Sequence, residues 1–411
     1  MKTILPFLLF AACALFFVSD TSARGTSTKE PVRQMPSALE SDRQAMEGYA
    51  VEYDNLRPIG GASPRDYRLV QLALLLDTSN SMDGLIGQAK SQLWRIVNEL
   101  ARLQKRGEDI RLEVALYEYG NNSLPVTSGY IRQVVPFTRD LDKLSEALFS
   151  LDTNGGSEYC GHVIGSSLNR LRWNSSDEGL KMIFIAGNEP FNQGTVSYEV
   201  ACRWAADRDI VVNTIHCGDY RLGIETWWQR GALLGGGNYF SIDSDRIFRG
   251  YTTPYDDDLN ALNQRINKTY VPYGKRGKQN YARQAEQDVN AAQQSAAISA
   301  ARVATKGSKL YKAAEWDLVD ALDEEQVSVD KLEKEYLPEE LQEMSDDELT
   351  SYVSQKKQER VKVKQQIAEL SKKRDDYIRQ KEKEAAGDET LGSAILKTLR
   401  TQAEARDFTF D

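Results

Sequence analysis

The chain has 411 residues, enough for about two domains, and 27% of its residues are charged. Its formal net charge is −9 and no basic stripe runs through it, which argues against nucleic acid as the main partner. Beyond the N-terminus, no stretch approaches the roughly twenty consecutive apolar residues of a membrane-spanning helix, so we expect no stable membrane span.

The first 23 residues have the features of a secretory signal peptide. Lys2 precedes an apolar run, and the small residues at positions 21–23 provide a cleavage site. Residues 24–65 are polar and rich in proline, which predicts a flexible tether. We therefore expect a soluble, exported protein.

A continuous apolar run at residues 72–76 ends at Asp77, and Ser79 and Ser81 follow at alternating positions. A run without polar alternation predicts a strand buried on both faces, as in a parallel sheet covered by helices. A helix is predicted next, at residues 85–106. Ligand sites in open α/β sheets lie at the carboxyl ends of strands, and three oxygen side chains there suit a hard divalent cation. The alternative is that these side chains only cap the helix.

Downstream residues follow strand and helix periodicities in turn. Residues 109–119 predict a second strand, and residues 131–137 predict an antiparallel edge strand after a turn. Apolar spacing predicts helices at residues 140–151, 161–173, 197–208 and 225–234. Trp227 and Trp228 are adjacent in the last of these, and we expect one to be buried and the other exposed.

The Asp77-x-Ser79-x-Ser81 motif after a buried strand resembles the metal-ion-dependent adhesion site (MIDAS) of the von Willebrand factor type A (VWA) domain. Residues 155–157 (Gly-Gly-Ser) stand where that family has a second metal-site hydroxyl. Three further segments look like its last strands, at residues 180–186, 210–217 and 235–242. The resemblance implies an α/β, Rossmann-like fold with a doubly wound, mainly parallel sheet, and we expect this VWA domain at residues 66–249.

The resemblance also implies a bound divalent cation. We expect Mg²⁺, with Mn²⁺ or Ca²⁺ as alternatives. The family usually has an acidic residue after the fourth strand, where this sequence has Gly187. Asn188 and Glu189 just beyond it are the candidates for supplying that oxygen, directly or through water. The candidate metal-site residues are Asp77, Ser79, Ser81, Ser157, Asn188 and Glu189.

Beyond residue 249 strand signals vanish, and Ala, Gln, Glu and Lys dominate. This composition predicts a mostly helical C-terminal region at residues 250–411 with coiled-coil character. Helices are expected at residues 257–268, 279–305, 309–322, 345–385 and 391–405. Ser345 and Glu348 form a capping box at the start of the longest helix. A narrow apolar stripe on that helix suits a helical hairpin or a coiled-coil seam; it consists of Val363, Ile367, Leu370 and Tyr377.

The order of elements, with the segments 269–274 (Thr-Tyr-Val-Pro-Tyr-Gly), 316–320 (Trp-Asp-Leu-Val-Asp) and 337–340 (Leu-Pro-Glu-Glu), is similar to that of a group of exported bacterial proteins. Those proteins join a VWA domain to a helical tail and lack an assigned activity. The likeness implies a periplasmic setting if the host has an outer membrane.

Cysteine and histidine provide no zinc site or catalytic triad. Three cysteines remain after the signal peptide, so not all of them can pair, and the pairing stays open; they are Cys160, Cys202 and Cys217. For both histidines, His162 and His216, packing or hydrogen bonding is the expected role.

These sequence features are consistent with three functions. The first is a non-enzymatic binding module, in which a partner protein's acidic side chain completes the coordination of the cation. The second is a scaffold whose site has lost its metal because of Gly187. The third is a metal-assisted hydrolase with Glu189 or Glu158 as the base, for which the sequence supplies no further ligands.

Overall fold

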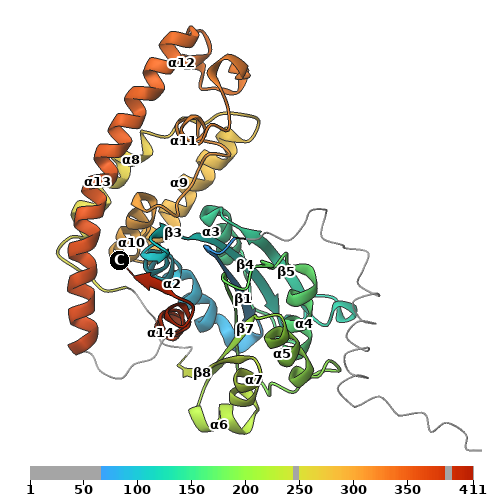
Figure 1. The fold of residues 1–411 in the computed structure, drawn as a ribbon. Helices are drawn as coiled ribbons and strands as arrows, with labels where there is room; N and C mark the ends of the chain where they lie inside the picture. Colours follow the sequence, from blue (N-terminus) through green and yellow to red (C-terminus); the bar gives the residue numbers. More distant parts are fainter. Residues whose placement is uncertain (1–65, 244–249, 385–390, 411) are drawn as a thin grey trace, which may run out of the picture.

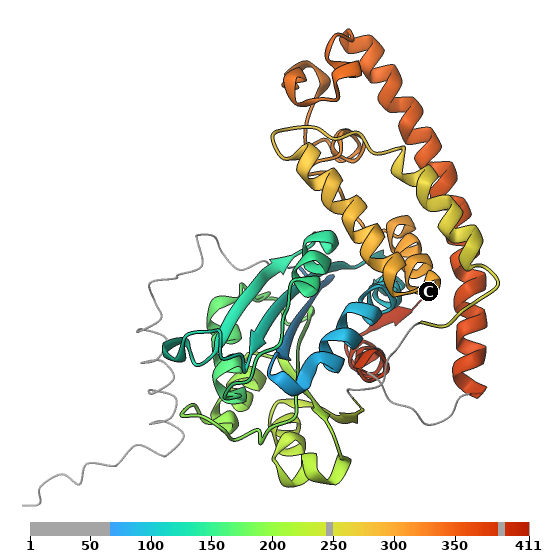
Figure 2. The same ribbon diagram turned by 180° about the vertical axis from the view of Figure 1, so that it is seen from behind.

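The computed structural model describes residues 66–243, 250–384 and 391–410 (Figure 1; Figure 2 shows the opposite side). The predicted signal peptide, the tether and residues 244–249 lie outside the described residues. In both views, a long helical arm extends from an α/β body, and the last helix returns to that body. None of the helices in the three described ranges combines the length and the apolar character needed to cross a membrane.

A six-stranded sheet forms the centre of the α/β body. Its strands are β1 (Leu69–Asp77), β4 (Arg111–Tyr119), β5 (Ile131–Thr138), β6 (Leu180–Gly187), β7 (Val211–Cys217) and β8 (Gly236–Ile242). They lie side by side in the order β5-β4-β1-β6-β7-β8, and only the edge strand β5 is antiparallel to its neighbour. This is a doubly wound arrangement, so the predicted α/β fold with a mainly parallel sheet is confirmed.

All nine residues of β1 are buried, as its apolar run predicts. Successive side chains of a strand point to opposite faces, so Leu72 and Leu74 enter one core and Ala73 and Leu75 enter the other. The first face is covered by α2 (Asp83–Leu100), α3 (Leu141–Phe149) and α14 (Leu391–Glu404). The second is covered by α4 (Cys160–Arg170), α5 (Tyr198–Asp207) and α7 (Trp228–Leu234).

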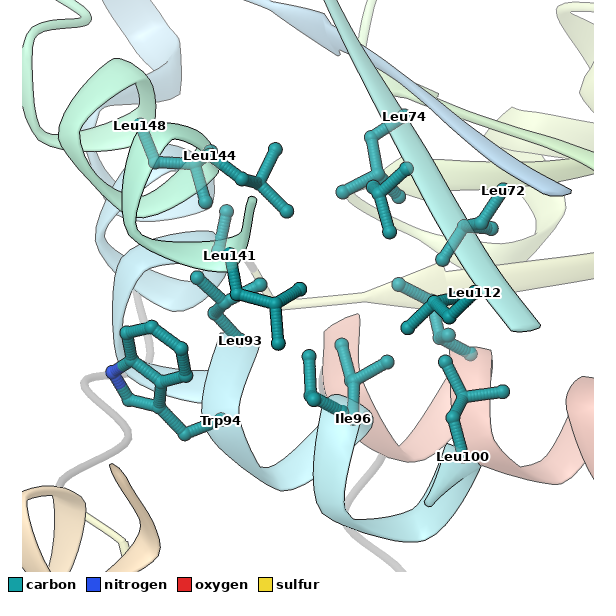
Figure 3. Packing of buried hydrophobic residues seen from close by; sticks show 14 of the residues in the cluster. Leu72, Leu74, Leu93, Trp94, Ile96, Leu100, Leu112, Leu141, Leu144 and Leu148 are labelled. Atoms are coloured by element: carbon teal, nitrogen blue, oxygen red, sulfur yellow. The ribbon is translucent and has the colours of Figure 1, made fainter. Parts of the chain in front are cut away.

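The first core is closely packed between the sheet and α2. Figure 3 shows the leucines of β1 and β4 facing a row of α2 side chains and three leucines of α3. Burying a leucine of this kind contributes about 1.5–3 kcal/mol. On the other face, Trp228 is 0% exposed whereas Trp227 is 44% exposed, so the prediction of one buried and one exposed tryptophan is confirmed.

The predicted helix at residues 85–106 is wrong at its C-terminal end. α2 ends at Leu100, and β2 (Leu103–Lys105) instead pairs with β3 (Glu108–Asp109) and with β9 (Phe408–Phe410). β9 comes from the far end of the chain, and the side chain of Phe408 is buried. This long-range pairing takes the backbone out of the helix.

The helical arm consists of α8 (Asp256–Asn267), α9 (Gly277–Gln294), α10 (Ala296–Gly307), α11 (Leu318–Asp323), α12 (Glu339–Gln342) and α13 (Asp346–Glu384). The capping box of α13 is confirmed, because the Ser345 N–H donates to Glu348 Oε2 at 2.8 Å and the Glu348 N–H donates to Ser345 Oγ at 3.3 Å. Val363 and Ile367 of its apolar stripe are buried, and α13 packs against α8 and α10.

Two predicted helices of the arm are wrong in part. The helix expected at residues 279–305 is broken at Ser295, whose extended backbone separates α9 from α10 and whose Oγ caps α10 by accepting from the Ile298 N–H. The helix expected at residues 309–322 is restricted to α11. At the start of α11 the chain bonds to the 269–274 segment: the Tyr273 N–H donates to the Trp316 carbonyl at 2.9 Å, and the Leu318 N–H donates to the Val271 carbonyl at 2.8 Å.

A buried ionic cluster joins the arm to the α/β body. Arg302 of α10 is 1% exposed, and its Nη1 donates to Asp142 Oδ1 of α3 at 2.8 Å. Asp288 of α9 accepts from both Arg302 and Lys306. Such charges are tolerated in a core only when they are paired, so these contacts fix the two parts against each other. α14 also packs against α2, although it follows α13 in the chain. The division at residues 249 and 250 stays a prediction.

Candidate metal site

The candidate site lies at the carboxyl end of β1, where the loops after β1, β4 and β6 and the loop before α4 meet. Backbone hydrogen bonds join three of these loops. The Thr78 N–H donates to the Tyr119 carbonyl at 2.9 Å, and the Asn154 N–H donates to the Thr78 carbonyl at 2.9 Å. The Asn122 N–H donates to the Gly155 carbonyl at 2.9 Å. These bonds hold the loop that contains Ser157 against the end of β1.

Asp77 is 0% exposed and has one bonded and one unbonded carboxylate oxygen. Its Oδ1 accepts from the Ser79 N–H at 2.7 Å, whereas its Oδ2 has no hydrogen-bond partner within the described residues. The hydroxyl of Ser79 is buried and equally unpartnered there. A carboxylate oxygen and a hydroxyl are therefore buried at the end of β1 without a hydrogen-bond partner among the described residues.

Ser81 and Asn188 meet at the outer side of the site. Asn188 Nδ2 donates to Ser81 Oγ at 3.3 Å, and Asn188 Oδ1 is buried without a partner among the described residues. Behind Asn188, the buried His216 donates from Nε2 to the Asn188 carbonyl at 3.2 Å. Burial lowers the pKa of His216, which favours the neutral ring. His216 therefore holds the loop in place.

Glu189 lies at the rim. Its carboxylate is exposed and accepts from Gln193 Nε2 at 3.2 Å, while its carbonyl accepts from Trp228 Nε1 at 2.9 Å. The buried indole of Trp228 thus fixes the Glu189 backbone and leaves the carboxylate facing outward.

Ser157 is half-buried and lies between two closely packed neighbours. A Cβ on Gly156 would lie 2.3 Å from the Gly120 carbonyl oxygen, so the loop approaches β4 this closely only because residue 156 is glycine. The next residue, Glu158, is buried. Gly120 has a φ of 78°, and a Cβ there would lie 2.7 Å from Glu158 Cγ and 2.8 Å from Asp77 Oδ1. Glu158 and Asp77 therefore converge over Gly120.

The two carboxyl groups affect each other's protonation. Burial raises the pKa of Asp77 to about 6, and hydrogen bonds with Glu158 and Ser79 oppose that shift. Burial and then the adjacent Asp77 charge raise the pKa of Glu158. Two buried carboxylates at one site cannot both stay charged unless a positive charge compensates them.

The donor set fits a hard divalent cation. Within the described residues, four buried oxygen atoms without a hydrogen-bond partner belong to this region: Asp77 Oδ2, Ser79 Oγ, Glu158 Oε2 and Asn188 Oδ1. Buried polar atoms in native proteins are nearly always bonded, so such a concentration indicates a missing ligand. No group of three or more His, Cys, Asp and Glu residues suited to a metal occurs in the described ranges. An ion here would depend on hydroxyl, amide and water oxygens beside the carboxylates.

The structure thus joins the loop with Ser79 and Ser81 to the loop with Ser157 and places Asn188 beside Ser81. From the sequence, Glu158 is a candidate only for the base of a hydrolase. Its position directly after Ser157 was the available signal, but the close packing at Gly120 could not be read from the sequence. Cys160, Cys202 and Cys217 are buried and form no disulfide with one another.

No family model matches the sequence, and neither does any curated protein. Among solved structures, the chain is similar to BatB from Bacteroides thetaiotaomicron, with 18% identity over 42% of this chain and 90% of that chain and a TM-score of 0.32. The vWF domain of the pilus tip protein Mfa5 from Porphyromonas gingivalis has 11% identity over 44% and 91%, with a TM-score of 0.30. Proximal thread matrix protein 1 from the mussel byssus, with a zinc-occupied MIDAS motif, has 11% identity over 44% of both chains and a TM-score of 0.33.

The sheet order and the loop arrangement agree with the family resemblance in the sequence. The Asp-x-Ser-x-Ser motif follows the central strand, and the loop with Ser157 is bonded to it. The α/β body therefore has the fold that the resemblance to the VWA domain implies.

Proposed function

We propose that the α/β body is a protein-interaction module that binds its partner through a divalent cation at the carboxyl end of β1. The observation that carries this proposal is the group of buried, unpartnered oxygen atoms of Asp77, Ser79 and Asn188. Leaving such an atom unsatisfied costs about 1–3 kcal/mol. A cation would compensate all of them at once.

Asp77, Ser79, Ser81 and Ser157 would hold the ion, directly or through water, and Asn188 would supply a further oxygen. When bound, the ion supplies a positive charge to which an acidic side chain of a partner can coordinate. Asp77 contributes the buried negative charge, and the Ser79 N–H orients its carboxylate. Ser81 is exposed, so a partner can reach this side of the site.

An apolar surface beside the site supports a protein partner. It is formed by exposed large side chains on α6 (Tyr220–Glu225), on α7 and between them: Tyr220, Leu222, Ile224, Trp227 and Leu233. These helices are bonded to the loop after β6, because the Phe191 N–H donates to the Thr226 carbonyl at 2.9 Å. Clustered exposed apolar side chains are typical of interaction surfaces. The partner we propose therefore combines a carboxylate with neighbouring apolar residues.

Chelator-dependent capture tests this function. The chain is immobilised and incubated with the exported protein fraction of its host in Mg²⁺ or in EDTA, in parallel with Asp77→Asn. The predicted signal peptide supports the choice of the exported fraction. We expect a partner that the wild type retains in Mg²⁺ and releases in EDTA, and that Asp77→Asn does not retain.

Magnesium calorimetry separates this function from a metal-free scaffold. Wild-type protein should give saturable heat with MgCl₂, and Asp77→Asn should give none while keeping its circular dichroism spectrum. A wild type that gives no saturable heat, or a partner that is retained equally in EDTA, would refute the proposal.

A further inference from the structure

Residue 187, where the family usually has an acidic residue, has no room for a side chain in this protein. A Cβ on Gly187 would lie 2.5 Å from the Tyr119 hydroxyl oxygen and 3.0 Å from Asp77 Oδ2. Tyr119 is 0% exposed, and its hydroxyl donates to the Ala186 carbonyl at 3.0 Å. The tyrosine side chain therefore takes the space that a carboxylate at residue 187 would need.

Glu158 brings a second carboxylate to Asp77 from a different loop. Its side chain is 3% exposed, and it meets Asp77 over the bare Cα of Gly120. The backbone is also anchored, since the Glu158 N–H donates to Gln193 Oε1 at 3.4 Å. Its Oε2 is buried and has no hydrogen-bond partner in the described part of the chain. Glu158 thus has a fixed place beside Asp77 and an unused acceptor.

Burying a carboxylate beside another one is costly unless a cation or hydrogen-bond donors satisfy both groups. The protein makes room for this unfavourable pair with a glycine in the left-handed region at residue 120. A cation that both carboxylates bind would offset this cost, and each carboxylate has one oxygen without a hydrogen-bond partner in the described residues, Asp77 Oδ2 and Glu158 Oε2.

We propose that Glu158 is the second carboxylate of the cation site and replaces the acidic residue that is absent at position 187. This assignment rests on the proposed function and names a further ligand for its ion, a hard divalent cation such as Mg²⁺ or Mn²⁺. With Glu158 included, the protein supplies two negative charges to a doubly charged ion. Glu189 then stays at the rim, bonded to Gln193.

Calorimetric titration with MgCl₂ and MnCl₂ tests the assignment on the wild type, Glu158→Gln and Glu189→Gln. Glu225→Gln is the matched control, because Glu225 is an exposed glutamate on α6 outside the site. We expect Glu158→Gln to weaken binding at least about tenfold, since even groups that only support metal ligands have effects of about 10–100-fold. Glu225→Gln should bind within about twofold of the wild type, well below that range.

Thermal denaturation in EDTA shows that Glu158→Gln is folded. Its Tm should equal or exceed that of the wild type, because the substitution removes a buried carboxylate next to Asp77. Wild-type affinity in Glu158→Gln, with binding lost in Asp77→Asn, would overturn the assignment and leave the proposed function intact. A loss in Glu189→Gln but not in Glu158→Gln would also overturn it. A wild type without saturable heat would refute the proposed function itself.

Discussion

Gly187→Ala tests whether the Tyr119 side chain occupies the space beside residue 187, at the end of β6. The new Cβ would lie 2.5 Å from the Tyr119 hydroxyl oxygen, closer than Cβ atoms in proteins approach other atoms. The Tyr119 side chain belongs to the packed core on that face of the sheet. Overpacking of this kind costs about 1–3 kcal/mol. We expect Gly187→Ala to lower the free energy of unfolding by that amount.

A double-mutant cycle with Tyr119→Phe tests whether Tyr119 causes the loss of unfolding free energy in Gly187→Ala. Tyr119→Phe removes the hydroxyl and its 3.0 Å hydrogen bond to the Ala186 carbonyl, at a cost of about 1 kcal/mol. In that background the closest atom to a Cβ at residue 187 is Asp77 Oδ2 at 3.0 Å, so the alanine should cost less. The coupling free energy should lie between about 0.5 and 3 kcal/mol.

Urea denaturation followed by circular dichroism measures all four proteins of the cycle. EDTA is included so that a bound ion does not contribute to the stability. Additive costs, with a coupling below about 0.3 kcal/mol, would refute the role of Tyr119. So would a Gly187→Ala protein as stable as the wild type.

Three further outcomes follow from the structure. In EDTA, the free energy of unfolding should fall as the pH rises between about 4.5 and about 9, because the folded chain keeps the Glu158 proton that the unfolded chain loses. Denaturation from pH 5 to 8 should show this slope, at most about 1.4 kcal/mol per pH unit. A Glu158→Gln profile that is not flatter than the wild-type profile would contradict this prediction. Asp288→Asn should cost about 3–5 kcal/mol in urea denaturation by leaving Arg302 and Lys306 underpaired. Its exposed control Asp330→Asn should stay within about 0.5 kcal/mol of the wild type, and equal costs would refute the role of the ionic cluster. Trp227→Gly should keep or raise the Tm, since Trp227 has a φ of 74°, yet should reduce partner capture; full capture would exclude Trp227 from the interaction surface.

The sheet could be predicted because its signals are local. The run at residues 72–76 lacks polar alternation, and the structure buries that strand on both faces. The errors occur where a distant segment determines the backbone. α2 stops early because β2 pairs with β9, and the 309–322 segment becomes helical only at Leu318, after residues that bond to the 269–274 segment. Helical periodicity contains no information about such partners.

The candidate site shows the same limit. The Asp-x-Ser-x-Ser motif and the hydroxyl at Ser157 can be found in the sequence because they have fixed spacing and neighbouring glycines. Glu158 could not be recognised as Asp77's neighbour, because their approach depends on two glycines from different loops, Gly120 and Gly156. Gly187 was visible as a departure from the family pattern, but the tyrosine that occupies its space lies on another strand.

The most direct test of a cation at the end of β1 is a crystal of the protein grown with MnCl₂ and measured for the anomalous signal of manganese. A peak within about 2.0–2.6 Å of an Asp77 carboxylate oxygen is the predicted result. A crystal of the folded protein with no anomalous peak near Asp77 at saturating MnCl₂ would contradict the proposed cation site.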